Sequence, residues 1–390
     1  MGVTGPRFET LTIKGFRRLL DVKLELRPVS VMIGANGTGK TSVLDVLALL
    51  ARSAKGELKQ AISDLGGLAQ VATLDRANSL DLYVEASGPT PLPIHYAIRL
   101  APLAVGYAIE KEYLSSNRVS LDRKLRPLFN SEGPSIDGHR YRDDRSGKLV
   151  EYDGSIDSSE TTLGQVGGLD ESTREFRRRL ASVSHYHVLN VEQRSAVRLP
   201  QQLRPAELPG TDGEDLVSSL FSLRESARKR FEAIEDSLRA AFPRFERLEF
   251  PPVAAGTISL GWREHGVSRP FYMNQLSEGT LRYLWLTTLL QSPGLTALTL
   301  IDEPEVSLHP ELLSLLAEQF REASERTQLV VATHSDTLIR FLKPEEVVVL
   351  DSDEEGMTTL TRASELDLDE WLKDYSLDEL WRNGRMGARA

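Results

Sequence analysis

The sequence contains no cysteine, so disulfide bonds, thiolate zinc sites and iron–sulfur clusters are excluded. Long apolar runs are also absent: the longest, residues 43–51 and 284–290, fall short of the roughly 20 residues that cross a bilayer. Residues 1–9 are polar and lack the apolar core of a secretory signal. These absences predict a cytoplasmic protein that does not enter a membrane.

Positive charge is in deficit as well, with 47 lysines and arginines against 57 acidic residues and a net charge of −10. A molecule of this charge repels polyanions as a whole, so nucleic-acid binding would require a local basic surface. The 390 residues, 40 % apolar and 27 % charged, are sufficient for one large globular domain or two ordinary ones.

Apolar and polar residues alternate between residues 8 and 33, which predicts three short strands and an antiparallel opening. We expect a helix over residues 41–55, directly after a glycine-rich loop. Further strands are expected at 80–85, 94–100 and 107–114.

The middle of the chain is less regular. Residues 130–172 are rich in glycine, serine and aspartate, which predicts an exposed, mobile insertion. A long helix is expected over 214–241, ending before Pro243, and strands at 247–250 and 257–262.

From residue 277 onward, apolar strands alternate with helices. This pattern predicts a parallel sheet covered on both faces. We expect helices at 278–291, 310–325 and 336–342, and strands at 297–301, 328–332 and 346–350.

The segment VMIGANGTGKTSVLDVL fits the phosphate-loop pattern G-x-x-x-x-G-K-[ST] and lies between a predicted strand and a predicted helix. Its backbone N–H groups would surround phosphates, Lys40 would reach the β- and γ-phosphates, and the Thr41 hydroxyl would ligate Mg²⁺. The alternative is a chance glycine-rich turn. The predicted nucleotide-binding residues of the loop are Asn36, Gly37, Thr38, Gly39, Lys40, Thr41 and Ser42.

The segment LTLIDEPEVSLHP is an apolar strand that ends in Asp302 and Glu303. Polar groups at the carboxyl end of a parallel strand face the ligand crevice. Asp302 would hold the magnesium shell, and Glu303 would orient or deprotonate the attacking water. A carboxylate pair at a helix N-terminus is the simpler alternative.

Two shorter segments complete the set. NQLSEGT places Ser277 and Gly279 at a helix start, where they form either an anion site or a plain N-cap. ATHS places His334 at a strand end, where it would contact a γ-phosphate or be merely structural.

In this order the motifs resemble the ABC ATPase heads of the SMC, RecF, Rad50 and OLD group, and most closely the soluble ATPases often labelled AAA-type. In that comparison GANGTGKT is the Walker A, LSEGT the signature, LTLIDEPE the Walker B, SLHP the D-loop and ATHS the switch histidine. The opening IKGFRRL is similar to the family's I-x-N-F-R, with Arg17 at the arginine that contacts phosphate and Gly15 in place of the asparagine.

The resemblance implies an α/β fold with a phosphate-loop parallel sheet flanked by helices, an antiparallel β N-terminal lobe and a helical insertion region. The whole of 1–390 would be one head. Its expected parts are 1–125 with the Walker A, 126–250 as insertion and helical region, 251–350 with the signature, Walker B, D-loop and switch histidine, and 351–390 as a tail.

The sequence departs from the family at several points. Glu278 places a negative charge where transporter signatures usually have glycine. The Q-loop glutamine, a metal ligand, has only one candidate, Gln193, far from Lys40 in sequence. Heptads for coiled-coil arms are missing, and the residues after His334 are too few for the nuclease domain of OLD proteins.

The resemblance also implies function: Mg²⁺-dependent ATP hydrolysis at sites shared between two copies, with Ser277 and Gly279 acting on the nucleotide of the opposing copy. Expected partners are a second copy of the chain, possible DNA and a separate nuclease or effector, in DNA maintenance or anti-phage defence. Two alternatives stay open: the ATPase subunit of a membrane transporter, and a slowly hydrolysing, ATP-gated regulatory scaffold.

Three other features have simpler interpretations. Two clusters of basic residues are interpreted either as solvated helix faces or as contacts to phosphates. His185 and His187 lack acidic company in the sequence, which disfavours a metal site. The apolar residues of the tail at 371–387 could dock on the body of the same chain or on another chain, and docking on the same chain is favoured. The basic clusters are Arg174, Arg177, Arg178 and Arg179, and Arg228, Lys229 and Arg230.

Overall fold

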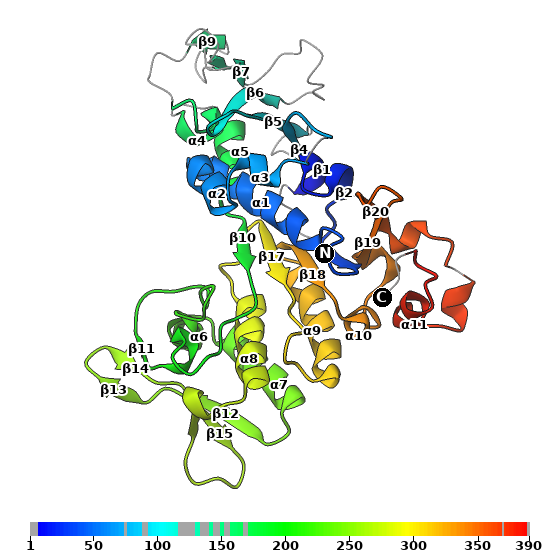
Figure 1. The fold of residues 1–390 in the computed structure, drawn as a ribbon. Helices are drawn as coiled ribbons and strands as arrows, with labels where there is room; N and C mark the ends of the chain where they lie inside the picture. Colours follow the sequence, from blue (N-terminus) through cyan, green and yellow to red (C-terminus); the bar gives the residue numbers. More distant parts are fainter. Residues whose placement is uncertain are drawn as a thin grey trace.

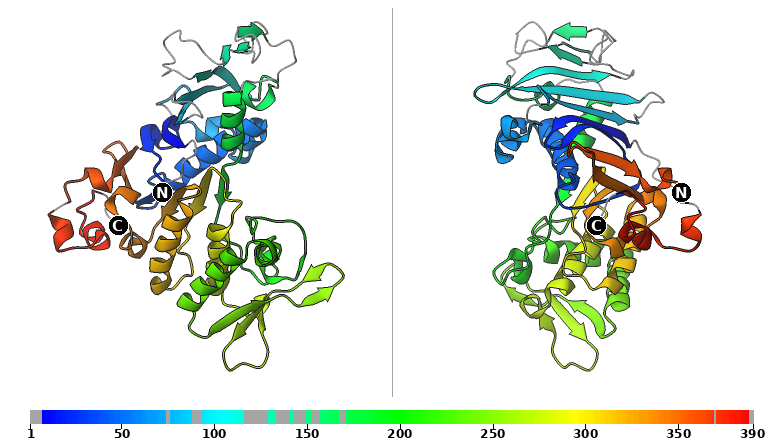
Figure 2. Two further views of the ribbon diagram at one scale, coloured as in Figure 1. Left: turned by 180° about the vertical axis from the view of Figure 1, so that it is seen from behind. Right: turned by 45° about the vertical axis from the view of Figure 1, so that its right-hand side comes forward.

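The computed structural model describes residues 7–73, 76–87, 93–115, 129–132, 140–142, 149–151, 157–166, 171–368 and 370–387. An antiparallel sheet lies at one end of the molecule, a parallel sheet in the middle and a helical lobe with β hairpins at the other end (Figure 1). The C-terminal segment packs at the side, next to the last strands of the central sheet (Figure 2).

The larger sheet has eight strands in the order β2-β1-β4-β5-β6-β7-β8-β9, and each pairs antiparallel with its neighbours. The predicted antiparallel opening is therefore confirmed. The strands are β1 (Phe8–Phe16), β2 (Leu19–Glu25), β4 (Leu80–Ala86), β5 (Ile94–Pro102), β6 (Tyr107–Ser115), β7 (Phe129–Glu132), β8 (Arg140–Arg142) and β9 (Leu149–Glu151).

The central sheet has six strands in the order β10-β17-β18-β3-β19-β20, parallel except for β20. The predicted parallel sheet is confirmed, and the sheet brings residues 29–34 next to residues from the C-terminal half. Its strands are β3 (Val29–Gly34), β10 (Ser184–Tyr186), β17 (Leu298–Asp302), β18 (Gln328–Thr333), β19 (Val347–Ser352) and β20 (Thr358–Arg362).

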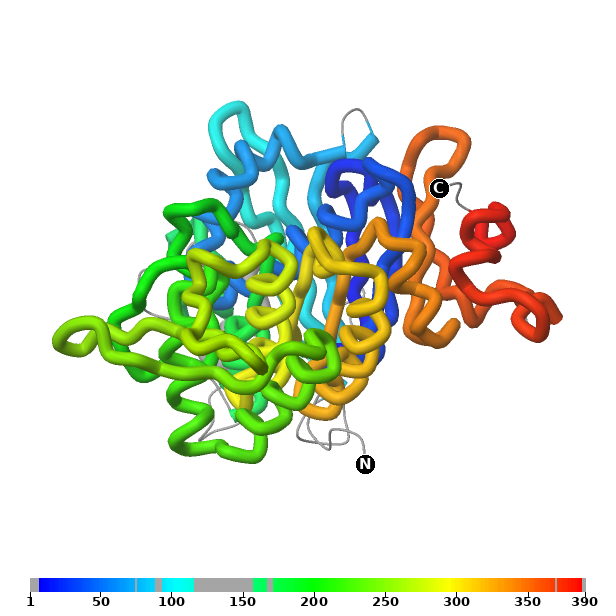
Figure 3. The backbone as a smooth tube through the Cα atoms, turned by 90° about the horizontal axis from the view of Figure 1, so that it is seen from below, coloured from blue at the N-terminus to red at the C-terminus, as the bar shows by residue number. Residues whose placement is uncertain are grey.

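This sheet separates two apolar cores, as alternation along β3 shows: Met32 faces one core, whereas Val31 and Ile33 face the other. On the Met32 side lie α1 (Lys40–Lys55), α2 (Leu58–Asp64), α3 (Leu68–Val71), α4 (Thr162–Gln165) and α5 (Glu171–Ala181). On the other side lie α6 (Leu216–Ser226), α7 (Arg228–Ala241), α8 (Glu278–Gln291), α9 (Pro310–Ala323) and α10 (Asp336–Ile339). The view from below shows these helices clustered under the sheet (Figure 3).

The expectation of an exposed insertion over 130–172 is wrong for residues 161–166. Thr161 and Leu163 are fully buried there, and the carboxylate of Glu112 accepts hydrogen bonds from the N–H groups of Thr162 and Leu163. Burial raises the pKa of Glu112, and these hydrogen bonds oppose the rise. Polar composition misled the prediction because it gives no sign of a buried carboxylate on β6. Most of the remaining insertion lies outside the described residues.

The long helix expected over 214–241 is in fact two helices, α6 and α7, because Ala227 leaves the helical region at φ −137° and ψ 52°. The strand expected over 257–262 is likewise split between two small sheets. One sheet contains β11 (Gln201–Gln202), β13 (Pro252–Ala254) and β14 (Thr257–Ile258), and the other contains β12 (Phe245–Glu249), β15 (Gly261–Glu264) and β16 (Phe271–Tyr272).

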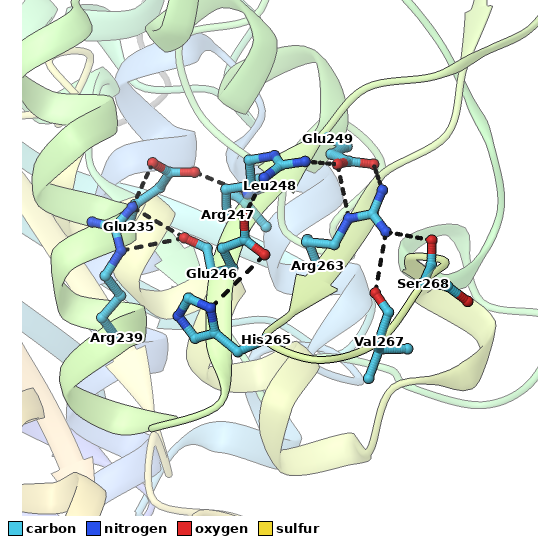
Figure 4. Close-up of polar contacts among 10 residues, drawn as sticks. All are labelled: Glu235, Arg239, Glu246, Arg247, Leu248, Glu249, Arg263, His265, Val267 and Ser268. Atoms are coloured by element: carbon cyan, nitrogen blue, oxygen red, sulfur yellow. Dashed lines mark hydrogen bonds and ion pairs between the residues drawn. The ribbon is translucent and has the colours of Figure 1, made fainter.

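Hydrogen bonds connect α7 to β12, and an ion pair connects β12 to β15, at the surface of this lobe (Figure 4). Glu249 accepts hydrogen bonds from Arg247 and Arg263, and Glu235 accepts one from the N–H of Leu248. Exposed pairs of this kind contribute little stability each, about 0–1 kcal/mol. The arginines of this hairpin are therefore matched by acids rather than forming a basic surface.

The tail docks on the body of the same chain, as expected. Leu380 and Trp381 of α11 (Leu377–Arg382) are buried, and Arg382 donates to Asp336 at 2.6 Å. In the parts of the chain that the structure describes, no helix combines the length and apolar character required to span a bilayer.

Candidate functional site: a phosphate loop with carboxylates and a histidine

The phosphate loop connects β3 to α1 in the predicted place. Gly37 and Gly39 have φ of 80° and 103°, the left-handed region that favours glycine. A Cβ on Gly39 would lie 2.8 Å from the Thr358 hydroxyl, which itself donates to the Thr38 carbonyl at 2.8 Å. Strand β20 therefore supports the loop from behind, a contact that the sequence did not indicate.

Lys40 begins α1 and is almost fully buried. Its Nζ donates to the carbonyl oxygens of Gly34 and Ala35 at 2.7 and 3.0 Å. Burial lowers the pKa of Lys40 to about 8, although the charges of Glu303 and Asp302 oppose this shift. Among the described residues the Lys40 ammonium has acidic neighbours but forms no ion pair, so its charge is available to a phosphate.

A cavity of about 290 Å³ opens in front of the loop. Seven of the predicted residues line its walls, whereas Asn36 and Thr38 belong to the loop without lining the cavity. Asp302 and Glu303 are not among the described residues that line it. Arg18, which the sequence analysis did not single out, also lines it. The wall residues are Arg17, Arg18, Gly37, Gly39, Lys40, Thr41, Ser42 and His334.

Arg17 reaches this cavity from the β1–β2 turn. Its guanidinium donates to Asp45 at 2.6 Å and to the Ser42 hydroxyl at 3.3 Å, so it is fixed against α1. The turn also explains why Gly15 replaces the family's asparagine. Gly15 has φ of 82°, and a Cβ there would lie 2.3 Å from the Ser79 carbonyl oxygen.

Three non-glycine residues in the described ranges have positive φ: Arg17, Glu303 and Ser307, at 49°, 46° and 62°. Each lies in a different motif of the resemblance, namely the opening, the Walker B and the D-loop. Strained backbone of this kind costs about 1–3 kcal/mol and concentrates at functional sites. The strain therefore indicates function at all three segments.

The two carboxylates of the Walker B lie at the end of β17, beside β18, whose end carries His334. The Nε2 of His334 lies 3.4 Å from Glu303 Oε1. Burial and the Glu303 carboxylate raise the pKa of Asp302 to about 6, while burial and the Lys40 ammonium lower the pKa of His334. A neutral imidazole beside a carboxylate is suited to hold a water molecule or a phosphate oxygen.

Glu305 was missed by the sequence analysis. Its Oε1 accepts hydrogen bonds from the Thr333 hydroxyl at 2.7 Å and from the N–H groups of His334 and Ser335 at 2.8 and 3.1 Å. Glu305 therefore fixes the segment that carries His334. The second glutamate of DEPE was the available signal.

The signature residues lie elsewhere. Ser277 caps α8 by accepting a hydrogen bond from the Thr280 N–H at 3.1 Å, and its side chain is exposed. A Cβ on Gly279 would lie 2.4 Å from the Ser307 carbonyl oxygen, so the signature and the D-loop are packed together. Neither Ser277 nor Gly279 is among the described residues that line the cavity in front of Lys40.

Gln193, the candidate Q-loop residue, is exposed in the segment after β10. No described contact joins it to the phosphate loop, and its metal-binding role stays a prediction. The same segment instead brings His185 and His187 close to Asp302. No acidic residue lies next to these histidines in the sequence, but the neighbouring strand β17 places the Asp302 carboxylate beside them.

The first arginine cluster proved to be mainly structural. Arg177 donates to the carbonyl oxygens of Ala54, Gly164 and Val166, while Arg179 is buried over the ring of Phe8. Both interpretations considered for this cluster, a solvated face and a phosphate contact, are therefore wrong for these two arginines, because α5 is packed against α1 and β1.

A strand, a glycine-rich loop around a buried lysine, and carboxylates and a histidine at adjacent strand ends define a phosphate-loop ATPase. The chain belongs to the family described as "AAA domain, putative AbiEii toxin, Type IV TA system", which matches residues 29–340. It is an ATPase of this class, and nucleotide binding is part of that assignment.

Solved structures agree on the fold. One match is the crystal structure of an SmcHead bound to the C-winged helix domain of ScpA, with 13 % sequence identity and a TM-score of 0.53. The match covers 94 % of this chain and 99 % of the SmcHead chain. An Smc head domain with an extended coiled coil, bound to the C-terminal domain of ScpA derived from Pyrococcus furiosus, is 12 % identical, covers 95 % and 98 %, and gives 0.55. The expected ABC-type head fold is thereby confirmed.

Proposed function

We propose that this protein is an ATP-dependent dimerising ATPase whose two sites each combine the phosphate loop of one copy with the signature of the other. The observation that carries the proposal is the position of Ser277, exposed at the start of α8 and absent from the walls of its own phosphate cavity. An exposed helix N-terminus that carries a serine hydroxyl binds anions readily.

In the proposed reaction each residue acts through a defined atom. The Lys40 ammonium leaves the Gly34 and Ala35 carbonyl oxygens to bind the β- and γ-phosphates. The Thr41 hydroxyl and the Asp302 carboxylate fit Mg²⁺, because hard oxygen ligands suit this ion. The ion would reduce the charge that builds up on the transferred phosphoryl group.

Glu303 orients the attacking water and accepts its proton. His334, whose Nε2 lies 3.4 Å from Glu303, would donate a hydrogen bond to the γ-phosphate next to the water that Glu303 orients. Arg17 and Arg18 lie on the same cavity wall and would neutralise phosphate oxygens.

Two-fold symmetry makes both sites equivalent, so ATP acts as a cross-link between two copies. We extend the proposal to a role in which the ATPase acts with a separate effector protein, in anti-phage defence or DNA maintenance. The family description, which includes a putative toxin of a Type IV TA system, supports the defence alternative.

The test is the assembly state of Glu303→Gln, which keeps the shape of the side chain and removes the base. With ATP and Mg²⁺ its mass by analytical ultracentrifugation should double, and without nucleotide it should remain that of one chain. The control Lys40→Ala/Glu303→Gln should stay monomeric in both conditions. If Glu303→Gln bound ATP and its mass did not change, the dimer proposal would be wrong.

A further inference from the structure

Two histidines lie against the Walker B aspartate. Strand β10 pairs parallel with β17, with His185 opposite Leu300 and Tyr186 opposite Ile301. Tyr186 is buried in the core, so His185 and His187 project from the other face of the strand. Their ring centroids are 3.9 Å apart.

The register places His187 beside Asp302, the last residue of β17. One ligand atom from each of His185, His187 and Asp302 lies within 4.8 Å of the other two. In a four-coordinate site with bonds of 2.0–2.1 Å, ligand atoms lie about 3.4 Å apart. His187 is exposed, so its ring can rotate and bring its ligand atom closer to the other two.

His185 provides an independent sign of a missing partner. Its Nε2 atom is buried and has no hydrogen-bond partner among the residues that the structure describes, which is uncommon because such a group has lost its water. A neutral imidazole presents one nitrogen lone pair, the form that binds metals.

We propose that His185, His187 and Asp302 bind one divalent transition metal ion. Two imidazoles and one carboxylate are a donor set for zinc, manganese, iron, cobalt or nickel ions, whereas Mg²⁺ prefers oxygen ligands alone. The exposed side of His187 gives the ion access from solvent, and a water molecule completes its coordination.

This ion is distinct from the Mg²⁺ of the proposed nucleotide site, and its binding requires no nucleotide. Asp302 belongs to both metal sites, since its carboxylate interacts electrostatically with Lys40 and with His187. A metal ion on the histidine side therefore changes the charge that Asp302 presents to the phosphate loop.

The experiment uses the full chain without a histidine tag and without nucleotide, stripped of metal with a chelator that is then removed. Titration with Co²⁺ should give visible d–d absorption that saturates at one ion per chain. Zn²⁺ should displace the Co²⁺, and a large excess of Mg²⁺ should leave the spectrum unchanged.

His187→Ala is the main variant because this side chain is exposed and its loss does not open the core. Its Co²⁺ affinity should fall at least about tenfold, as should that of Asp302→Asn. The control is His265→Ala, which removes an equally exposed histidine near a carboxylate, Glu246, in the distant lobe (Figure 4) and should bind Co²⁺ as the unaltered chain does.

Absence of a one-to-one Co²⁺ complex, or equal Co²⁺ affinity in His187→Ala and the unaltered chain, would overturn the proposal. Because no nucleotide is present, these outcomes are independent of whether ATP binds or whether two copies associate.

Discussion

The two halves of the proposed ATP site differ in how completely one chain builds them. The phosphate-loop half is held by contacts within one chain: Lys40 is buried, Arg17 is held by Asp45, and Glu305 fixes the histidine segment. The signature half is exposed, and the described hydrogen bonds of the Ser277 hydroxyl are with Thr280 of its own helix turn. In the proposed dimer, a single chain would therefore prepare phosphate binding and leave the other half to be completed by a second copy.

The difference has an energetic consequence. Hydrogen-bonded and buried groups are already ordered before ATP arrives, so little conformational entropy is lost when they bind phosphate. An exposed N-cap hydroxyl gains a partner only when another surface covers it. Binding of ATP and turnover should therefore respond differently to changes in the two halves.

The largest effect is expected in the phosphate-loop half. Lys40→Ala removes the cation that compensates the phosphate charge, so ATP turnover should fall by at least about 10³-fold. ATP binding, measured by isothermal titration, should weaken in the same variant. Lys59→Ala, an exposed lysine on α2, is the matched control and should leave both unchanged. Near-normal turnover in Lys40→Ala would show that this lysine lies outside the reaction site.

In the signature half, Ser277→Arg should separate binding from turnover. The variant should bind ATP within about threefold of the unaltered chain, because its own phosphate loop is intact, but lose about 10²- to 10³-fold in turnover. Equal losses of binding and turnover would indicate that both halves of the site belong to one chain.

A smaller effect is expected for Glu305→Ala, which leaves the histidine segment without its three hydrogen bonds. Turnover should fall about 10- to 100-fold, because the position of His334 is no longer fixed. Glu311→Ala, whose side chain is 88 % exposed at the start of α9, is the control. Unchanged turnover in Glu305→Ala would argue against a positioning role.

The smallest effect concerns stability. Arg177→Ala removes three hydrogen bonds between α5 and its neighbours and should lower the free energy of unfolding by about 2 kcal/mol. Arg178→Ala, 75 % exposed and paired with Glu175, should change it by less than about 0.5 kcal/mol. Urea denaturation measures both values. Turnover per folded molecule should be the same in both variants, and a larger stability loss for Arg178→Ala would contradict the packing of α5.

Much of the phosphate-loop half could be predicted from the sequence because its determinants are local. A glycine-rich loop between an apolar strand and a helix fixes Lys40, and carboxylates directly after an apolar strand fix Asp302 and Glu303. The parallel sheet followed from the alternation of apolar strands with helices, and the structure bears this out.

The rest depends on contacts between distant segments, which a single sequence does not display. The pairing of β10 with β17 brings His185 and His187 close to Asp302, and the sequence of residues 184–187 does not indicate that β10 pairs with β17. Residues 161–166 have the composition of a loop, but hydrogen bonds to the buried Glu112 hold this segment against the body of the protein. The break between α6 and α7 occurs at Ala227, a residue that by itself favours helix.

The most direct measurement of the central claim is the ATPase activity of a heterodimer. Ser277→Arg and Lys40→Ala chains, carrying different affinity tags, are co-expressed and purified through both tags. One of the two sites then combines Lys40 from the first chain with Ser277 from the second, so activity should recover to about half that of the unaltered dimer. A heterodimer no more active than either parent, while the unaltered chain turns over normally, would contradict the shared site.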